Sequence, residues 1–314
     1  MTPEIRRAAE ILRAGGLVAF PTETVYGLGA DASSAEAVAR LYRVKRRPPD
    51  HPVIVHFASA KDAFSFAREI SSSARKLAEK FWPGPLTLVL PRSPSAKDFV
   101  TGSQETVGLR VPSHPVAHAM LEAFGGGVAA PSANRFGAVS PTTAQHVRDE
   151  LNGDVDLVLD GGAAEIGVES TIVDLSGADV VLLRPGNVSK QQIEQTLKTS
   201  ILEKSETSPR HPGGMERHYA PGTPTRLVSP HALDAEIARR RDRVAVLAFS
   251  RPDERVEFWI RMPREPSAFA RKLYAALREL DAAGCQAILI EAPPAEPAWA
   301  AVNDRLRRAS GAVE

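Results

Sequence analysis

Short apolar runs alternate with stretches of helical periodicity over the first 200 residues of the chain. In residues 3–14, Ile5, Ala9 and Leu12 fall on one helical face, and two glycines follow. The same reasoning predicts helices near 35–44, 71–81, 115–123 and 189–198, and one that begins with Ser140 as N-cap and Pro141 at the first position. Strands are predicted over 17–20, 53–55, 86–90, 107–111, 128–130, 155–159, 171–175 and 180–183. Because strands and helices mix irregularly, the pattern favours an α/β domain of α+β character.

Residues 203–214 interrupt this pattern, because they carry almost no apolar side chains and show no periodicity, which is typical of a linker. Beyond them the elements alternate regularly. The predicted order is strand 225–228, helix 231–240, strand 244–249, helix 267–282, strand 287–290 and helix 298–309. Such alternation predicts a small parallel α/β unit. We therefore divide the chain into a domain over 1–200, a linker over 201–222 and a domain over 223–314.

The composition, with 43% apolar and 25% charged residues among 314, is typical of a globular protein that is long enough for two domains. A net charge of +1 creates no global field that would attract nucleic acid or a membrane. Cys285 is the only cysteine, which excludes a disulfide framework and a cysteine-built zinc site and fits a reducing compartment. No apolar run reaches the roughly 20 residues of a membrane span, and the first residues lack the apolar core of a signal peptide. We expect a cytoplasmic protein that is not embedded in a membrane.

Five polar clusters lie along the chain, most of them where a predicted strand begins or ends. They are residues 22–29 (TETVYGLG), 45–48 (KRRP) with His51 and His56, 106–110 (TVGLR), 130–134 (APSAN) with Ser140, and 167–171 (GVEST) with Arg184. Open α/β sheets bind their ligands at strand ends. Arginine and lysine together with hydroxyl groups favour a ligand that carries phosphate. A carboxylate such as Glu23 or Glu169 suits a metal ion or an amine.

Each cluster also has a purely structural interpretation. Lys45 and its basic neighbours lie at a predicted helix end, where cations interact favourably with the helix dipole. Ser140 taken alone is a helix cap. The Walker A sequence, the Gly-x-Gly-x-x-Gly fingerprint, Gly-x-Ser-x-Gly and His-Glu-x-x-His are all absent from the sequence. The residues themselves therefore predict only a ligand-binding α/β protein that handles phosphate.

Taken together, the clusters resemble the motifs of the YrdC/Sua5 family of threonylcarbamoyl-adenylate synthases. The matching segments are 21–28 (PTETVYGL), 45–48 (KRRP), 81–87 (FWPGPLT), 130–134 (APSAN) and 169–172 (ESTI). Two further segments, 218–221 (HYAP) and 303–309 (NDRLRRA), are similar to the linker and to the end of the second domain in the longer, Sua5-type form. The match extends over the whole chain and keeps the family's order.

The resemblance implies a fold and a reaction. The first domain would be a twisted mixed sheet around a basic cavity, the second a small Rossmann-like domain, and the linker would cross the mouth of the cavity. L-threonine, bicarbonate and ATP with Mg²⁺ would give L-threonylcarbamoyl-adenylate and pyrophosphate, a nucleotidyltransferase reaction without a prosthetic group or a protein-bound metal. The product would serve the threonylcarbamoyl modification of adenosine 37 in tRNA, with a downstream transferase complex and possible direct contact with tRNA.

The resemblance also assigns roles to individual residues. The positions that match the L-threonine site are Thr24, His56, Arg110, Ala130 and Ser170. The positions that match the ATP site are Arg47, His51, Thr106, Ser132, Ser140, Arg184 and Tyr219. The implied catalytic cations are Lys45, Arg47 and Arg110, and Arg110 suits a bidentate grip on the threonine carboxylate.

The chain departs from the family's usual pattern in three places. His51 stands where the family often has lysine or asparagine, so its contact with ATP would depend on pH. Residues 107–110 (VGLR) replace a more usual Val-Ala-Val-Arg and keep the arginine. Residues 215–217 (MER) lack an aromatic residue and a cation that usually precede the HYAP segment, which concerns the closure of the linker.

Three other functions compete with this interpretation. An RNA-binding or ribosome-maturation protein of the same fold would use a concave basic surface to recognise duplex RNA, but Thr24, Ser132 and Ser170 are typical of a small-molecule pocket. Carbamoyl transfer in metal-centre maturation requires cysteine-rich zinc modules, which a chain with Cys285 alone cannot build. A non-catalytic relative is disfavoured because the basic residues of the cavity are kept.

Overall fold

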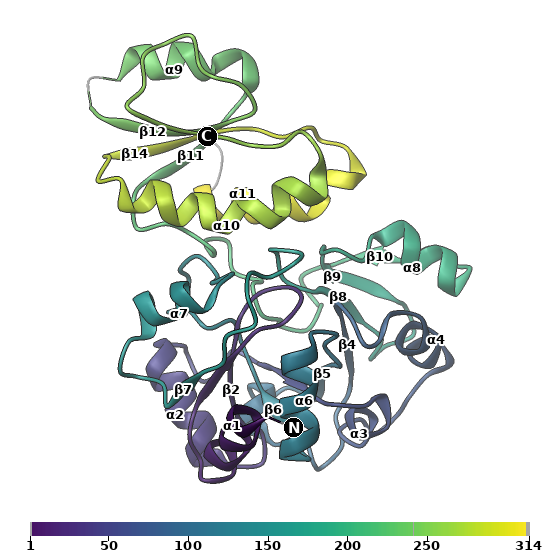
Figure 1. Ribbon diagram of the computed structural model, residues 1–314. Helices are drawn as coiled ribbons and strands as arrows, with labels where there is room; N and C mark the ends of the chain where they lie inside the picture. Colours follow the sequence, from purple (N-terminus) through teal and green to yellow (C-terminus); the bar gives the residue numbers. More distant parts are fainter. Residues whose placement is uncertain (1, 241, 312–314) are drawn as a thin grey trace. The chain divides into compact units, whose positions relative to one another are not determined.

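The computed structural model describes residues 2–240 and 242–311, and these form two compact units (Figure 1). The first unit contains residues 2–136, 141–165 and 169–214, and the second contains 137–140, 166–168 and the described residues from 215 onward. The segment predicted as a linker, 201–222, is thus shared between the two units. The outermost residues of the predicted domains, 1 and 312–314, lie outside the described residues.

The first unit is a ten-stranded mixed sheet with helices packed around it (Figure 1). Its strands are β1 (Val18–Phe20), β2 (Gly27–Asp31), β3 (Ile54–His56), β4 (Leu86–Pro91), β5 (Thr106–Arg110), β6 (Val128–Ala129), β7 (Leu157–Val158), β8 (Thr171–Asp174), β9 (Val181–Arg184) and β10 (Leu202–Glu203). Its helices are α1 (Pro3–Arg13), α2 (Ala35–Lys45), α3 (Ala60–Phe64), α4 (Ser72–Phe81), α5 (Asp98–Thr101), α6 (Pro115–Phe124), α7 (Ala144–Leu151) and α8 (Lys190–Leu197). The strand order is β10-β9-β8-β4-β5-β3-β6-β2-β1-β7.

The central strands β4 and β5 separate the core of the unit from the opposite face of the sheet. Leu86, Leu88 and Leu90 of β4 pack into the main hydrophobic core. Thr87 and Val89 lie between them in sequence and line a pocket on the opposite side of the sheet. This division follows from the alternation of side chains along a strand. The opposite face is where the polar side chains of the candidate site gather.

Two predictions about local structure are wrong. No strand was predicted over residues 27–31, but they form β2, which pairs with β1 and with β6. Ser140 and Pro141 do not start a helix; α7 begins at Ala144, and the side chain of Thr143 caps it by accepting a hydrogen bond from the main-chain N–H of His146. The carbonyl oxygen of Pro141 instead accepts a hydrogen bond from the N–H of Tyr26 at 2.9 Å, so this segment supports the loop that precedes β2.

The second unit is a four-stranded parallel sheet with helices on both faces (Figure 1). Its elements are β11 (Thr225–Val228), the 3₁₀-helix Pro230–Ala232, α9 (Leu233–Arg239), β12 (Val244–Ala248), β13 (Phe258–Arg261), α10 (Pro266–Ala282), β14 (Ala287–Glu291), the 3₁₀-helix Pro297–Trp299 and α11 (Ala300–Ser310). The strand order is β11-β14-β12-β13. Val244 and Val246 of β12 pack against Leu233 and Ile237 of α9, while α10 and α11 cover the other face (Figure 1).

The predicted fold class is therefore confirmed: a large mixed α/β sheet is followed by a small, parallel, Rossmann-like unit. Strand β13 of the second unit was not predicted from the sequence pattern. Within the described residues, no helix has both the length and the apolar character that crossing a membrane requires.

Candidate active site

The register of β3 and β5 brings predicted site residues together. The two strands run parallel, with Ile54 opposite Gly108 and His56 opposite Arg110. Since alternate residues of a strand face the same side, Thr106 and Arg110 lie on one face of β5, and His56 lies beside Arg110 on β3. A cation and an imidazole that are 54 positions apart in sequence are thus neighbours on the sheet.

Arg110 is buried and held by three groups from other segments. Its Nη2 donates to Oε1 of Glu23 at 2.7 Å and to Oγ1 of Thr24 at 3.0 Å, and its Nε donates to the carbonyl oxygen of Gly84 at 3.2 Å. Among the described residues, Nη1 has no hydrogen-bond partner. In this arrangement Nη1 is the nitrogen whose N–H groups are not used within the described residues. The bidentate contact with a threonine carboxylate stays a prediction, and with these hydrogen bonds in place a ligand would meet Nη1 alone.

The loop that carries Thr24 is fixed by hydrogen bonds within it. The hydroxyl of Thr22 lies 2.8 Å from the hydroxyl of Thr24 and donates to the carbonyl oxygen of Val25 at 2.6 Å. The N–H groups of Thr24 and Val25 both donate to the Thr22 hydroxyl at 3.2 Å. Thr22 therefore positions Thr24, a role that the sequence did not assign to it.

His56 is buried and electrically neutral. Burial, and then the positive charge of Arg110, lower the pKa of His56 from 6.5 to about 3. Its ring meets that of Phe20 edge-on, with the centroids 6.2 Å apart. Within the described part of the chain its Nδ1 has no hydrogen-bond partner. A buried polar atom without a partner is costly, so Nδ1 is a natural contact for a hydroxyl or amine of a ligand.

Ser170 and Arg184 form a second polar group on the same sheet. The Ser170 hydroxyl lies 2.8 Å from the Thr87 hydroxyl and accepts a hydrogen bond from Arg184 Nη2 at 3.1 Å. Nε of Arg184 donates to the carbonyl oxygen of Ser170 at 3.0 Å. Ala130 follows β6, and its N–H donates to the carbonyl oxygen of Ile54 at 2.9 Å, which ties this position to β3.

Lys45 and Arg47 surround the loop that carries Ser132. Lys45 Nζ donates to the carbonyl oxygens of Ser132 and Asn134. Burial, followed by the positive charge of Arg47, holds the pKa of Lys45 well below its ordinary value. Arg47 Nη2 donates to the carbonyl oxygen of Pro52 at 2.7 Å. Lys45 therefore shapes the loop in this structure, and its catalytic role stays a prediction.

Phe136 is a shared contact of the predicted ATP residues Arg47 and His51. The guanidinium of Arg47 lies 5.2 Å from the centre of the Phe136 ring, and the His51 ring meets it edge-on at 5.2 Å. Burial lowers the pKa of His51 from 6.5. This lowered pKa favours the neutral imidazole, so His51 supplies a weaker positive charge than the lysine often found at this position in the family.

A segment of the predicted linker covers Thr106. Oε1 of Gln104 accepts a hydrogen bond from the N–H of Arg210 at 2.7 Å, and Nε2 of Gln104 donates to the Arg210 carbonyl oxygen at 3.0 Å. Arg184 Nη1 donates to the carbonyl oxygen of Pro212 at 3.0 Å. The pocket beneath residues 210–212 has a volume of about 10 Å³, room for about one water molecule. The sequence did not identify Gln104 as the residue that holds residues 210–212 in place by hydrogen bonds.

The remaining predicted ATP residues, Ser140 and Tyr219, belong to the second unit. Tyr219 is buried and has a left-handed backbone (φ 59°). The centroid of its ring lies 4.2 Å from that of His218 and 5.9 Å from that of Tyr274. The guanidinium of Arg305 lies 5.2 Å from the centre of the same ring. The contacts of Ser140 and Tyr219 with ATP stay predictions.

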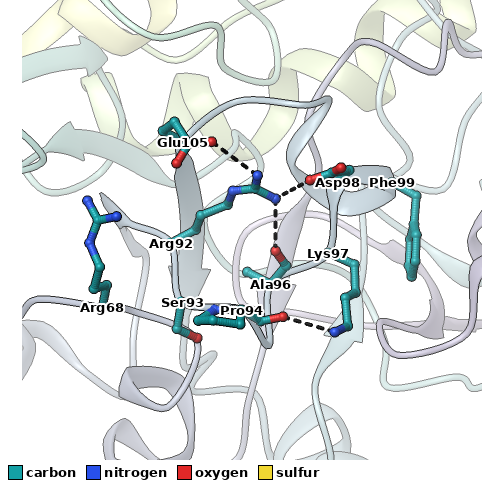
Figure 2. Close-up of a pocket in the computed structure, with 9 residues that line it drawn as sticks. All are labelled: Arg68, Arg92, Ser93, Pro94, Ala96, Lys97, Asp98, Phe99 and Glu105. Atoms are coloured by element: carbon teal, nitrogen blue, oxygen red, sulfur yellow. Dashed lines mark hydrogen bonds and ion pairs between the residues drawn. The ribbon is translucent and has the colours of Figure 1, made fainter.

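A larger pocket of the first unit is made of other residues. It has a volume of about 480 Å³ and is lined by Arg68, Arg92, Ser93, Pro94, Ala96, Lys97, Asp98, Phe99 and Glu105 (Figure 2). Its central side chain, Arg92, reaches between Asp98 and Glu105, both of them largely exposed (Figure 2). None of the predicted site residues lines this pocket, so size alone does not identify the functional site.

Comparison with known proteins connects the two units to one family. A family model described as "Telomere recombination" (Sua5_yciO_yrdC) matches residues 10–186, and one described as "Threonylcarbamoyl-AMP synthase, C-terminal domain" matches residues 188–311. The threonylcarbamoyl-AMP synthase of Pyrococcus abyssi is 40% identical over 322 residues, which cover 98% of this chain and 94% of the relative. The Bacillus subtilis protein of the same name is 38% identical, with 98% and 93% covered.

Solved structures agree with the sequence matches. The crystal structure of P. abyssi Sua5 complexed with L-threonine has a TM-score of 0.91 and 39% identity, and the match covers 98% of this chain and 94% of that one. E. coli YciO, with a TM-score of 0.52 and 27% identity, matches 58% of this chain and 89% of its own length. The chain therefore belongs to the YrdC/Sua5 family of threonylcarbamoyl-AMP synthases, in the two-domain, Sua5-type form.

Proposed function

We propose that this chain makes L-threonylcarbamoyl-adenylate and pyrophosphate from L-threonine, bicarbonate and ATP, which is a nucleotidyltransferase reaction. The observation that carries the proposal is the group formed by Arg110, Thr24 and His56. It offers a cation, a hydroxyl and a neutral imidazole with an unpartnered nitrogen in one buried place. An amino acid that bears a carboxylate, an amine and a hydroxyl presents the complementary groups.

The reaction requires two bond-forming steps. Bicarbonate, after protonation and loss of water, supplies CO₂; the threonine amine loses a proton and attacks its carbon to form a carbamate. A carbamate oxygen then attacks the α-phosphorus of ATP, the bond from this phosphorus to the bridging oxygen of the β-phosphate breaks, and pyrophosphate leaves. Neither step needs a nucleophile from the protein, so catalysis rests on positioning and on neutralising charge.

The named residues divide between the two substrates. Arg110 binds the threonine carboxylate through Nη1, while Thr24, Ser170 and His56 meet the hydroxyl and amine, and Ala130 leaves room beside them. For ATP, we propose that the basic side chains hold the triphosphate and that the hydroxyl groups, among them that of Tyr219 in the linker, complete the site. These residues are Lys45, Arg47, His51, Thr106, Ser132, Ser140, Arg184 and Tyr219.

Mg²⁺ is the expected companion of the triphosphate. Within residues 2–240 and 242–311, no group of three or more His, Cys, Asp or Glu side chains is placed to hold a metal ion. Phosphate oxygens and water would therefore supply most of the ligands, as is usual for Mg²⁺ bound to nucleotides. When bound, the ion neutralises charge on the phosphates.

The RNA-binding alternative is not favoured. Thr24, Arg110 and Ser170 are all buried, so a rigid duplex cannot reach the polar groups that define the site. We propose instead that the product is passed, in the cytoplasm, to a separate transferase complex that modifies adenosine 37 of tRNA. A direct contact between this chain and tRNA remains part of that proposal.

The test is pyrophosphate release by the purified chain with Mg-ATP, L-threonine and bicarbonate, each omitted in turn. We expect release to require all three, and to fall sharply in Arg110→Ala and Ser170→Ala. Release that does not depend on threonine, or no release despite tight binding of ATP, would contradict the proposal.

A further inference from the structure

Glu23 places a buried negative charge next to the cation that binds the substrate carboxylate. Its side chain is 5% exposed, and Oε1 accepts the hydrogen bond from Arg110 Nη2 at 2.7 Å. Oε2 accepts a hydrogen bond from the main-chain N–H of Ser113 at 3.2 Å. A carboxylate here weakens the attraction of Arg110 for any anion, and the proposed reaction gives it no task. Its presence therefore calls for an explanation.

The first consequence of the pair is geometric. A guanidinium has five N–H donors, one on Nε and two on each terminal nitrogen. In Arg110 the Nε donor is used by Gly84, and the Nη2 donors are used by Glu23 and Thr24. An anion can be bound by two nitrogens through the Nε/Nη2 edge or through the Nη1/Nη2 edge. Because Nη2 belongs to both edges and its donors are used, neither edge is free. A free edge of this kind is what makes arginine a strong ligand for phosphate groups.

The second consequence is electrostatic. The charges of Arg110 and Glu23 sum to zero at a contact distance in a buried site, where charges interact more strongly than in water. A zwitterionic amino acid also has no net charge, and its carboxylate can still reach Nη1. A phosphate group with two or more negative charges gains little from Arg110 and is repelled by Glu23.

This selectivity matters because both substrates and a product are present together. ATP and pyrophosphate bind, on the function proposed above, to basic residues of the same unit. We propose that Glu23 sets the specificity of the threonine subsite: by pairing with Arg110 it admits the single carboxylate of a zwitterionic amino acid and excludes phosphate groups. Glu23 acts through Arg110, and this role rests on the proposed function.

The experiment is calorimetric titration of L-threonine into the full chain, with and without inorganic phosphate at constant ionic strength. For the wild type we expect phosphate to change the Kd for L-threonine by less than about twofold. For Glu23→Gln we expect phosphate to raise this Kd by about tenfold, because the negative charge that repels phosphate at contact distance has been removed. Glu23→Asp keeps the charge and should behave as the wild type does. Glu105→Gln is the matched control, because Glu105 also pairs with an arginine (Arg92, 3.1 Å) but is 75% exposed.

The outcomes separate this proposal from the proposed function. A wild type that binds L-threonine but loses affinity in phosphate would overturn the role of Glu23 alone, and this holds even where Glu23→Gln fails to fold. A Glu23→Gln variant that folds and stays insensitive to phosphate would overturn it as well. A wild type that does not bind L-threonine would overturn the proposed function and this proposal with it.

Discussion

Arg110 and Arg92 both pair with carboxylates in the first unit, but only Arg110 does so inside the protein. The side chains of Arg110 and Glu23 are each 5% exposed, whereas Arg92 is 22% exposed and its partners Asp98 and Glu105 are 70% and 75% exposed. Exposed pairs are typically worth about 0–1 kcal/mol, while removal of one partner of a buried pair costs about 3–5 kcal/mol. A buried pair is therefore far more sensitive to the loss of one partner than an exposed pair, and in this chain the buried pair includes Arg110, the cation of the proposed threonine site.

The comparison also separates pocket size from function. The pocket around Arg92 has a volume of about 480 Å³, but water reaches its charges. Beside Arg110, the buried Nδ1 of His56 has no hydrogen-bond partner among the described residues, and Nη1 of Arg110 donates to none of them. The proposed site thus differs from the larger pocket in the burial of its charged and polar groups, and not in its volume.

The largest expected difference is between Arg110→Ala and Arg92→Ala, in both stability and activity. Arg110→Ala leaves Glu23 buried without its cation and removes the grip on the substrate carboxylate. We expect a loss of about 3–5 kcal/mol in the free energy of unfolding and a fall of about 10³-fold in kcat/KM for L-threonine. Arg92→Ala should change the free energy of unfolding by about 1 kcal/mol or less and leave the kinetics unchanged. Urea denaturation measures the free energy of unfolding, and threonine-dependent pyrophosphate release measures the kinetics. Equal effects of the two variants would contradict a special role of Arg110.

A smaller difference is expected in the dependence of stability on pH. The folded protein holds the pKa of His56 at about 3 because the ring is buried beside Arg110, whereas a histidine in the unfolded chain takes up a proton below about pH 6.5. The unfolded state then binds more protons, so folding stability falls as the pH is lowered from 6.5 toward 3. From pH 7 to pH 5 this amounts to about 2 kcal/mol.

His56→Gln should lose the pH dependence of stability that the buried histidine causes. We expect the difference in free energy of unfolding between the wild type and His56→Gln to shrink by about 2 kcal/mol from pH 7 to pH 5. In the exposed pocket the hydrogen bond to Asp98 raises the pKa of Arg92, which does not titrate in this range. Arg92→Ala should therefore keep the pH slope of the wild type. A constant difference for His56→Gln would mean that His56 is not buried in its neutral form.

The smallest effect is expected at the loop that joins the two regions. Gln104 and Glu105 are adjacent, but Gln104 bonds the segment that covers Thr106, whereas Glu105 bonds Arg92. Since the pocket beneath the segment has almost no free volume, a ligand at Thr106 must displace the segment. Gln104→Ala removes two exposed hydrogen bonds that together contribute about 1 kcal/mol. We expect the KM for ATP to fall about fivefold, because the covering segment then opens more easily.

Glu105→Gln is the control for this change and should leave the KM for ATP as it is in the wild type. Steady-state kinetics with varied ATP measure both variants. A rise in the KM for ATP in Gln104→Ala would show that the covering segment contributes to the nucleotide site rather than competing with the nucleotide.

The sequence predicted the polar clusters but not the way in which they combine. Thr24, Arg110 and Ser170 were identifiable because each belongs to a polar group at a strand end, and apolar runs defined most strands. The proximity of His56 and Arg110 depends on the register of β3 with β5, which no local pattern encodes. The sequence identified Glu23 only as an available carboxylate. Its pairing with Arg110, 87 positions away, also depends on the tertiary structure.

The missed elements have local explanations. Residues 27–31 (GLGAD) have low strand propensity, and they form β2 because β1 and β6 pair with them on both sides. Ser140 and Pro141 have the residue types of a helix start, but the carbonyl of Pro141 is used by Tyr26 and the helix begins further on, with Thr143 as its cap. In both places tertiary hydrogen bonds decide between local structures that the sequence alone leaves close in energy.

The most direct test of the central claim is a crystal structure of this chain with L-threonine. We expect a carboxylate oxygen of the ligand about 3 Å from Arg110 Nη1, with the Glu23–Arg110 pair intact and a hydrogen-bond donor of the ligand on Nδ1 of His56. A carboxylate bound to Arg184 instead, or a Glu23 side chain displaced from Arg110 by the ligand, would contradict it.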